Sequence, residues 1–254
     1  MKLLKIEGIV INEQAYGESS KILKIFTRDL GVISVMSRGC KKVKSPFRVA
    51  SSKLIHANFD ISYKENGIST LVGVDIINYF KNIVMDYHDL ERKIYAFSLI
   101  DLTNQMINHK EVDDDEKKEI YDLFISTLNK MDSLLNARIL LDIIMLKYLK
   151  FLGVNPSLDC CSNCGKKSNI VTMTSETFGF ICDECYTNQK IVDKKALKLT
   201  KMLYMVDIDR ITNLDVDESI HDVEKFISDY YNDHTGLYFN IDKKLKIVSK
   251  IEEI

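Results

Sequence analysis

The sequence predicts an α+β fold, in which a small N-terminal β-barrel precedes a helical domain that carries a four-cysteine module. Three observations predict this fold. The first 80 residues contain about five short apolar segments with turn signals between them. From about residue 86 onward, apolar residues recur at spacings of three and four, which is typical of helices. Five of the six cysteines lie between Cys160 and Cys185.

The predicted barrel is built from strands that follow one another closely along the chain. We expect strands at residues 2–11, 20–27, 32–36, 54–63 and 68–74. Asp29-Leu30-Gly31 forms the turn between the second and third strands, and Asn66-Gly67 is a hairpin signal between the last two. Short strands at this density favour a closed or nearly closed barrel.

The helical domain is predicted from its apolar periodicity. We expect helices from about residue 86 to 106, from about 113 to 128, and at 134–152, 194–206 and 219–231. The acidic run 113–115 suits a helix N-terminus. The segment 134–152 is apolar nearly all round, which is typical of the central helix of a bundle, and Gly153 ends it. Residues 238–254 show no clear pattern.

These patterns divide the chain into four parts. We expect a barrel domain at 1–80, a first helical part at 81–157, the cysteine module at 158–188 and a second helical part at 189–254. The hydrophobic fraction of 46% is sufficient for a sizeable core. We expect no signal peptide, because the N-terminus carries Glu7 and no small-residue cleavage site. We therefore expect a cytoplasmic protein without a membrane partner.

The cysteines form two matched C-x2-C knuckles, Cys161 with Cys164 and Cys182 with Cys185, separated by 17 residues. This is the spacing of a four-cysteine zinc site, in which two tight turns supply four thiolates at tetrahedral corners. Four protein ligands leave no open coordination position, so we expect one structural Zn²⁺. Cys160 could replace Cys161, although the regular spacing favours Cys161. An iron–sulfur cluster or unliganded thiols are the alternatives.

A basic segment follows the third predicted strand. It contains six cations and no acidic residue: Arg38, Lys41, Lys42, Lys44, Arg48 and Lys53. The first 81 residues hold 13 Lys and Arg against 7 Asp and Glu, whereas the rest holds 22 against 30. Lys and Arg that neutralise phosphates release counterions, so this asymmetry favours polyanion binding over a merely solvated face. Phe26, Phe47 and Phe59 are candidate platforms for base stacking, although core packing is their commoner role.

No short motif marks a catalytic site. The phosphate-binding, serine-hydrolase and zinc-protease patterns are missing from the sequence, and so is the complete zinc-deaminase pattern of H-x-E followed by P-C-x-x-C. The five histidines lie far apart, and the run 113–115 is better explained as a helix start than as a nuclease-type metal cluster. We therefore expect a protein that is not an enzyme. The alternative is a catalytic site whose residues are brought together only by folding, because such a site leaves no short motif in the sequence.

Three segments and the cysteine region carry a resemblance to a known family. The segments are Tyr16-Gly17-Glu18-Ser19-Ser20, Thr27-Arg28-Asp29-Leu30-Gly31 and Gly39-Cys40-Lys41-Lys42-Val43-Lys44-Ser45. Together with Leu152-Gly153, Pro156 and the knuckles, they resemble the bacterial RecO recombination-mediator family, over the chain to about residue 188. The resemblance implies an N-terminal OB-fold and a helical domain with a zinc module.

The resemblance also implies a function. Such proteins bind single- and double-stranded DNA, anneal complementary strands and, with RecR, load RecA onto DNA coated by single-strand-binding protein, acting at the nucleoid. The implied phosphate contacts are Arg38, Lys41, Lys42 and Lys44, with Arg48 on the same segment and Lys21 and Arg28 as secondary candidates. The implied zinc ligands are Cys161, Cys164, Cys182 and Cys185. The competing interpretation is a zinc-stabilised protein-interaction scaffold that does not bind DNA directly.

Overall fold

The computed structural model describes residues 2–86, 88–109, 113–238, 241 and 245. The chain forms two compact units, and each consists of two segments. Unit 1 comprises Met1–Asp89 and Ile107–Asp132. Unit 2 comprises Leu90–Met106 and Ser133–Ile254. We describe each unit by itself.

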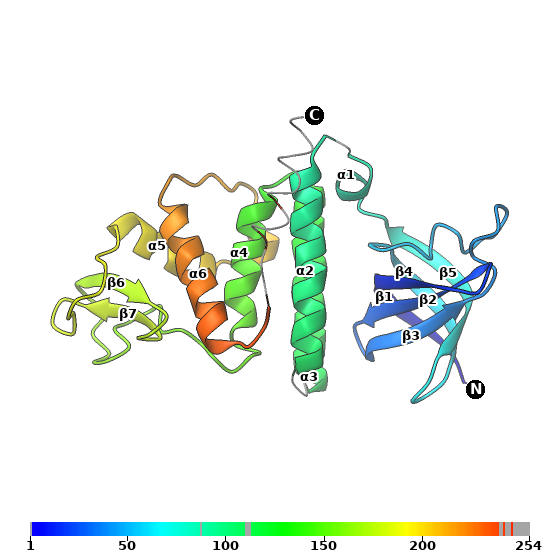
Figure 1. Cartoon of the computed structure of the whole chain (residues 1–254), viewed down its shortest axis with the longest axis horizontal. Coiled ribbons are helices and arrows are strands. Elements are labelled where there is room, and N and C mark those ends of the chain that lie inside the picture. Colours follow the sequence, from blue (N-terminus) through cyan, green and yellow to red (C-terminus); the bar gives the residue numbers. More distant parts are fainter. Residues whose placement is uncertain (1, 87, 110–112, 239–240, 242–244, 246–254) are drawn as a thin grey trace. The chain divides into compact units, whose positions relative to one another are not determined.

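Unit 1 contains a closed five-stranded barrel, as predicted (Figure 1). Its strands are β1 (Lys2–Tyr16), β2 (Ser20–Thr27), β3 (Gly31–Ser37), β4 (His56–Tyr63) and β5 (Ser69–Asn78). They pair in the order β1-β2-β3-β5-β4, and β4 closes the barrel against β1. All pairs are antiparallel except the short β3–β5 seam. β1 is longer than predicted, because a register shift between Val10 and Asn12 interrupts its alternation without ending its pairing with β2.

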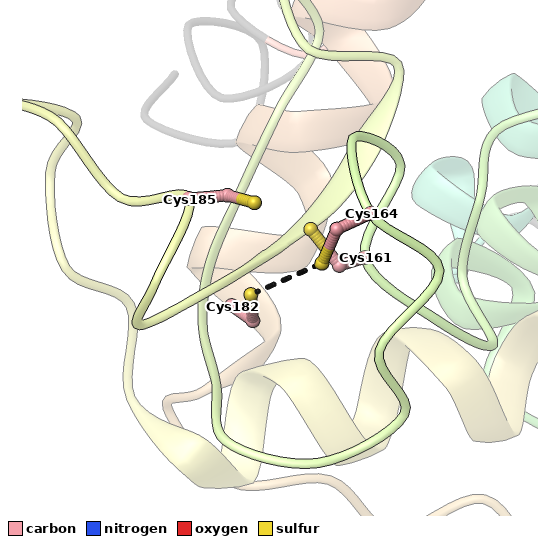
Figure 2. Close-up of side chains that lie close together, drawn as sticks. All are labelled: Cys161, Cys164, Cys182 and Cys185. Carbon is pink, nitrogen blue, oxygen red and sulfur yellow. Dashed lines mark hydrogen bonds between the residues drawn. The ribbon is translucent and has the colours of Figure 1, made fainter.

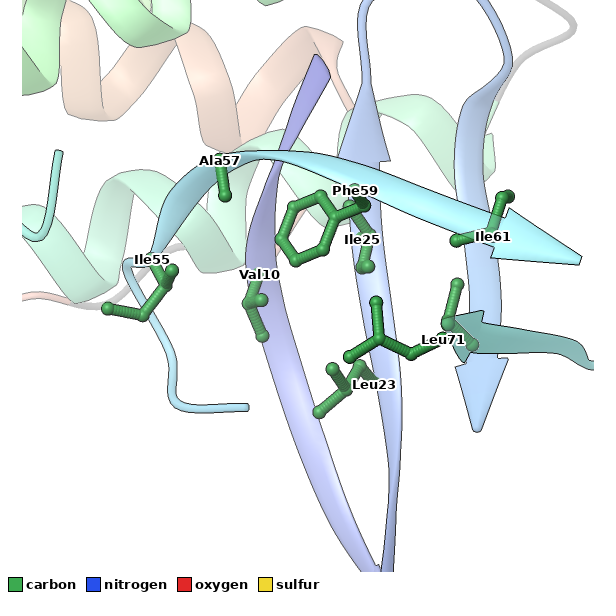
Figure 3. Packing of buried hydrophobic residues seen from close by; sticks show 9 residues of the cluster. Val10, Leu23, Ile25, Ile55, Ala57, Phe59, Ile61 and Leu71 are labelled. Carbon is green, nitrogen blue, oxygen red and sulfur yellow. The ribbon is translucent and has the colours of Figure 1, made fainter. Parts of the chain in front are cut away.

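The barrel interior is filled by apolar side chains from every strand (Figure 3). Leu23 and Ile25 come from β2, and Phe59 and Ile61 from β4, so residues two apart face inward together. Gly8 lies where β1 and β2 approach closely, since a Cβ there would be 2.7 Å from the Ile25 Cγ2 atom. A close-packed interior of this kind leaves no room for a ligand, so any binding must use the outside of the barrel.

Helix α3 (Asp114–Asp132) packs against the barrel within unit 1. The Phe26 ring of β2 meets the Tyr121 and Phe124 rings edge to face, with centroids 5.2 and 5.8 Å apart. The Tyr121 hydroxyl lies 3.3 Å from Nε2 of buried His56, and this nitrogen is 2.9 Å from Glu7 Oε1. α3 therefore packs with the barrel strands in unit 1. The predicted domain boundaries stay a prediction.

Unit 2 is built around helix α4 (Ala137–Tyr148), which is buried on nearly every side, as predicted for a central helix. Helices α5 (Lys194–Met205) and α6 (Ile220–His234) pack on α4 and on each other. Helix α2 (Leu90–His109) contacts α4 through a 3.0 Å hydrogen bond between the Thr103 and Tyr148 hydroxyls. The Tyr231 hydroxyl of α6 donates to the Met145 carbonyl at 2.9 Å.

Four short elements were not predicted. They are helix α1 (Lys81–Val84), the 3-10 turn η1 (Ile208–Arg210) and a hairpin of β6 (Ile170–Thr174) and β7 (Gly179–Cys182) inside the cysteine module. The acidic helix start is confirmed, because the Asp113 side chain accepts hydrogen bonds from the backbone of Asp115 and Glu116. Most of the unpatterned segment 238–254 lies outside the described residues. Within the described ranges, no helix has the length and apolarity to span a membrane.

Candidate nucleic-acid interface and metal centre

The basic segment folds into successive turns between β3 and β4. Lys42 donates its backbone N–H to the Gly39 carbonyl, and Ser45 donates to the Lys42 carbonyl, both at 3.1 Å. The Lys41 N–H donates at 2.9 Å to the Ser19 carbonyl in the β1–β2 turn. Buried Cys40 fixes the segment to the barrel. The backbone of the segment is therefore held in place, while its long side chains can extend into solvent.

Five cations of this segment are exposed. They are Arg38, Lys41, Lys42, Lys44 and Arg48, and within the part of the chain that the structure describes none of them forms an ion pair with a carboxylate. Lys53, at the end of the segment, is half-buried. Since like charges repel one another, five neighbouring unpaired cations make a site that an anion would stabilise.

The two secondary candidates are already paired with carboxylates. Lys21 Nζ is 2.6 Å from Glu13 Oε2 and donates to the Ser51 carbonyl at 3.1 Å. The Arg28 guanidinium donates two 2.8 Å hydrogen bonds to Asp122 of α3, and this carboxylate raises the pKa of Arg28. Both charges are therefore largely neutralised inside unit 1, and their role as phosphate contacts stays a prediction.

The three candidate stacking phenylalanines lie in or against the core. Phe26 and Phe59 are completely buried, and Phe47 packs against the barrel interior. A different aromatic side chain, Tyr16, is 56% exposed at the end of β1. It lines a concavity of about 570 Å³ together with Ser19, Ser20, Met36, Arg38, Gly39 and Lys42. The sequence signal for Tyr16 was its place directly before Gly17, at a strand end where an aromatic side chain need not face the core.

The four knuckle cysteines converge on one point (Figure 2). All four Sγ atoms lie within 4.8 Å of one another, and those of Cys164 and Cys182 are 3.6 Å apart. A disulfide would need about 2.05 Å. Zinc–sulfur bonds of about 2.3 Å in a tetrahedron place the sulfurs about 3.8 Å apart. The donor set and its spacing therefore fit a metal ion. Cys160 lies outside this cluster, with its Sγ 3.5 Å from Ser157 Oγ.

Backbone hydrogen bonds shape the first knuckle. The Cys161 N–H donates to the Lys166 carbonyl and the Gly165 N–H to the Cys161 carbonyl, both at 2.8 Å. Gly165 has φ +77°, which a residue with a Cβ adopts only with strain. Lys166 Nζ joins this knuckle to the second through Glu184 at 2.8 Å. The two turns are therefore held facing each other by contacts other than the sulfurs.

The thiols differ in acidity. Burial alone would raise the pKa of Cys161, but backbone hydrogen bonds from Cys182, Cys164 and Asn163 outweigh it and lower this pKa to about 6. A hydrogen bond with Cys164 raises the pKa of Cys185 to about 12. A bound cation favours the thiolate form of every ligand, so the cluster is a place where metal and protons compete.

A closed five-stranded barrel of this topology, in one chain with a four-cysteine cluster, defines an OB-fold protein with a module that could hold a metal ion. Family models give a more specific result. The model described as Recombination protein O N terminal matches residues 1–80, and Recombination protein O C terminal matches residues 87–240. The chain therefore belongs to the RecO family of DNA repair proteins, as its sequence motifs indicated.

Curated relatives agree over nearly the full length. DNA repair protein RecO of Listeria welshimeri is 29% identical over 254 residues, which cover 98% of this chain and 96% of the relative. DNA repair protein RecO of Bacillus cytotoxicus is also 29% identical, over 98% of both chains. The Bacillus pumilus protein of the same name is 28% identical over 99% of this chain. The match therefore includes both the barrel and the cysteine module.

Proposed function

We propose that this protein is a recombination mediator. It binds single- and double-stranded DNA, anneals complementary strands and acts with RecR to load RecA onto DNA coated by single-strand-binding protein. Membership of the RecO family supports this role and these partners. The role requires no covalent catalysis, in keeping with the expectation that the protein is not an enzyme.

One observation carries the DNA-binding part of the proposal. Among the described residues, the segment after β3 presents Arg38, Lys41, Lys42, Lys44 and Arg48 to solvent without acidic partners. Contacts of this kind neutralise phosphates without reading bases. Annealing needs such sequence-independent contacts, because two polyanions must approach each other while their base edges stay free to pair. The ordered backbone of the segment lowers the entropic cost of binding.

We also propose that the four-cysteine cluster holds one structural Zn²⁺. The thiolate donor set and the sulfur spacing support zinc over a harder cation, and four protein ligands leave no position for a substrate. Zinc would stabilise the fold of the module, whose hairpin is too short to be stable by itself. The ligands would be Cys161, Cys164, Cys182 and Cys185.

The decisive experiment reverses the charge of the segment. Lys41, Lys42 and Lys44 are replaced by Glu, and affinity for a labelled oligonucleotide is measured over a range of salt concentrations. We expect a sharp loss of affinity and a salt slope that is smaller by about 2–3, since each phosphate contact contributes about 0.7–0.9. The matched control replaces Lys194, Lys195 and Lys198, three exposed lysines of α5, by Glu and changes the net charge equally.

Three outcomes would count against the proposal. Equal losses in the two triple variants would mean that only net charge matters and that the segment has no special role. Undiminished affinity in the segment variant would remove the segment from the mechanism. If the wild-type protein binds no DNA at low salt but still binds RecR, the interaction-scaffold interpretation replaces the mediator proposal.

A further inference from the structure

The concavity beside the basic segment is lined by side chains of two kinds. Tyr16 and Met36 supply aromatic and apolar surface, and Arg38 and Lys42 supply positive charge. The hydroxyl residues Ser19 and Ser20 line it as well. An aromatic ring and cations in one concavity are a combination that binds a nucleotide, because the ring stacks on the base and the cations attract its phosphate.

Strand pairing brings these residues together. Tyr16 pairs with Ser20 across the β1–β2 turn, and Ile22 pairs with Met36, so β2 stands between the ends of β1 and β3. The turn at Gly17, with φ +59°, lets β1 reverse directly after Tyr16. Tyr16 is therefore carried by the barrel itself and not by a loose loop.

Hydrogen bonds attach the basic segment to the same turn. The Gly39 N–H donates to Ser20 Oγ at 3.1 Å, and Lys41 Nζ donates to the Gly17 carbonyl at 3.2 Å. The backbone around the concavity is thus fixed before a nucleotide enters, so binding has to order only side chains. Glu18, on the same turn, is the nearest acidic residue in sequence and does not line the concavity.

The exposure of Tyr16 needs a reason. An aromatic ring that is 56% exposed beside two cations contributes little to the core, unlike Phe26 and Phe59, which are completely buried. We infer that Tyr16 is a stacking platform for one unpaired nucleobase, with Arg38 and Lys42 holding the adjacent phosphate. This inference rests on the proposed DNA binding and adds a preference for single-stranded DNA. Only an unstacked base can offer its face to Tyr16, so the concavity selects single strands over duplex.

The chain offers a clean probe, because it contains no Trp. Tyr16→Trp therefore introduces a single indole, whose fluorescence a stacked base quenches. We expect quenching on saturation with a single-stranded oligodeoxythymidylate and little quenching with a blunt duplex. Tyr79→Trp is the matched control, since Tyr79 is 46% exposed on the same unit and does not line the concavity. It should bind the oligonucleotide equally and remain unquenched.

Affinities complete the test. We expect Tyr16→Ala to weaken single-strand binding about tenfold, equivalent to about 1.4 kcal/mol, and to change duplex binding little. Tyr16→Phe should restore the single-strand affinity, because stacking needs the ring and not the hydroxyl. Equal losses for single strand and duplex would overturn the inference, as would equally strong quenching by polyglutamate, which has no bases.

Fluorescence anisotropy of a labelled oligonucleotide separates this inference from the proposed function. If Tyr16→Trp binds DNA with normal salt dependence and its indole stays unquenched, the stacking platform is refuted and DNA binding by the segment stands. If neither wild type nor variant binds DNA at low salt, both proposals fall together.

Discussion

Arg28, directly after β2, forms a bidentate ion pair with Asp122 of helix α3. Both hydrogen bonds measure 2.8 Å, and the residues are 94 positions apart in the chain. Arg28 belongs to the motif that resembles the RecO family, yet in the folded protein its charge is matched by a carboxylate. Arg28 therefore differs from the cations of the segment after β3, which form no ion pair with a carboxylate in the described part of the chain.

The first prediction compares single neutralisations. We expect Lys42→Gln to reduce the salt slope of DNA binding by nearly one contact, about 0.7–0.9. Arg28→Gln should reduce the slope much less, because Asp122 already compensates its charge. Anisotropy titrations at several salt concentrations measure both slopes. Equal reductions would show that Arg28 leaves Asp122 when DNA binds, and would move it into the interface.

The second prediction concerns the metal. We expect one zinc ion per wild-type chain by elemental analysis, and none in Cys182→Ser, since Cys182 is a buried member of the cluster. The variant and the chelator-treated protein should both show a lower melting temperature, because metal binding contributes directly to folding. Cys160→Ser is the control and should keep its zinc. A protein that contains iron, with visible absorbance, would refute the zinc assignment.

The third prediction follows from Asp142 of α4. Its Oδ2 is buried without a hydrogen-bond partner in the described part of the chain. Burial raises the pKa of this carboxyl well above its ordinary value, Glu224 adds to the shift and Arg138 opposes it. The folded state therefore holds the proton more tightly than the unfolded state. The corresponding stability is present below the unfolded pKa of about 3.9 and is lost as pH rises from there toward the folded pKa.

Asp142→Asn removes this titration. We expect the melting temperature of the variant, relative to that of wild type, to increase from acidic to neutral pH. The increase should be about 2–4 °C for each kcal/mol of unfolding free energy that wild type loses through this titration. Asp215→Asn, at an exposed residue of unit 2, serves as the control and should follow wild type. Melting curves followed by circular dichroism test this, and parallel pH profiles for Asp142→Asn and wild type would contradict it.

The fourth prediction concerns Gly179 in the hairpin of the cysteine module. Gly179 has φ +131°, and a Cβ there would lie 2.3 Å from the Ser157 carbonyl oxygen. Because the obstacle is backbone, Gly179→Ala should destabilise unit 2 by about 2–4 kcal/mol. Gly153 has φ +74°, and a Cβ there would meet nothing within 4 Å, so Gly153→Ala should cost only about 1 kcal/mol. Denaturant unfolding measures the free energy of unfolding of both variants. Equal losses would mean that backbone strain at positive φ matters and that the contact with Ser157 does not.

Local patterns account for what the sequence predicted well. The strand alternation, the Asn66-Gly67 turn and the two C-x2-C knuckles are each determined by neighbours within a few residues. The central position of α4 also followed, because a segment that is apolar all round can be stable only when covered. Because such local patterns determine them, the barrel and the cysteine cluster could both be predicted from the sequence alone.

Long-range contacts account for what the sequence could not show. Nothing near Lys21 or Arg28 indicates that one would meet Glu13 across a hairpin and the other Asp122 on a distant helix. Likewise, the exposure of Tyr16 depends on which face of β1 turns outward after the register shift at Val10 and Asn12. Such features arise from tertiary pairing, and a single sequence does not encode them in any local pattern.

The two segments of unit 1 have a consequence for the order in which the protein can fold during synthesis. When a ribosome has released only the barrel strands, the Phe26 ring still lacks Tyr121 and Phe124, which have yet to be translated. In the nascent barrel, the Phe26 ring therefore stays without these contacts until the second segment, Ile107–Asp132, has been synthesised. Meanwhile Leu90–Met106 has already emerged and awaits partners from Ser133 onward, so neither unit can be finished before the other has begun.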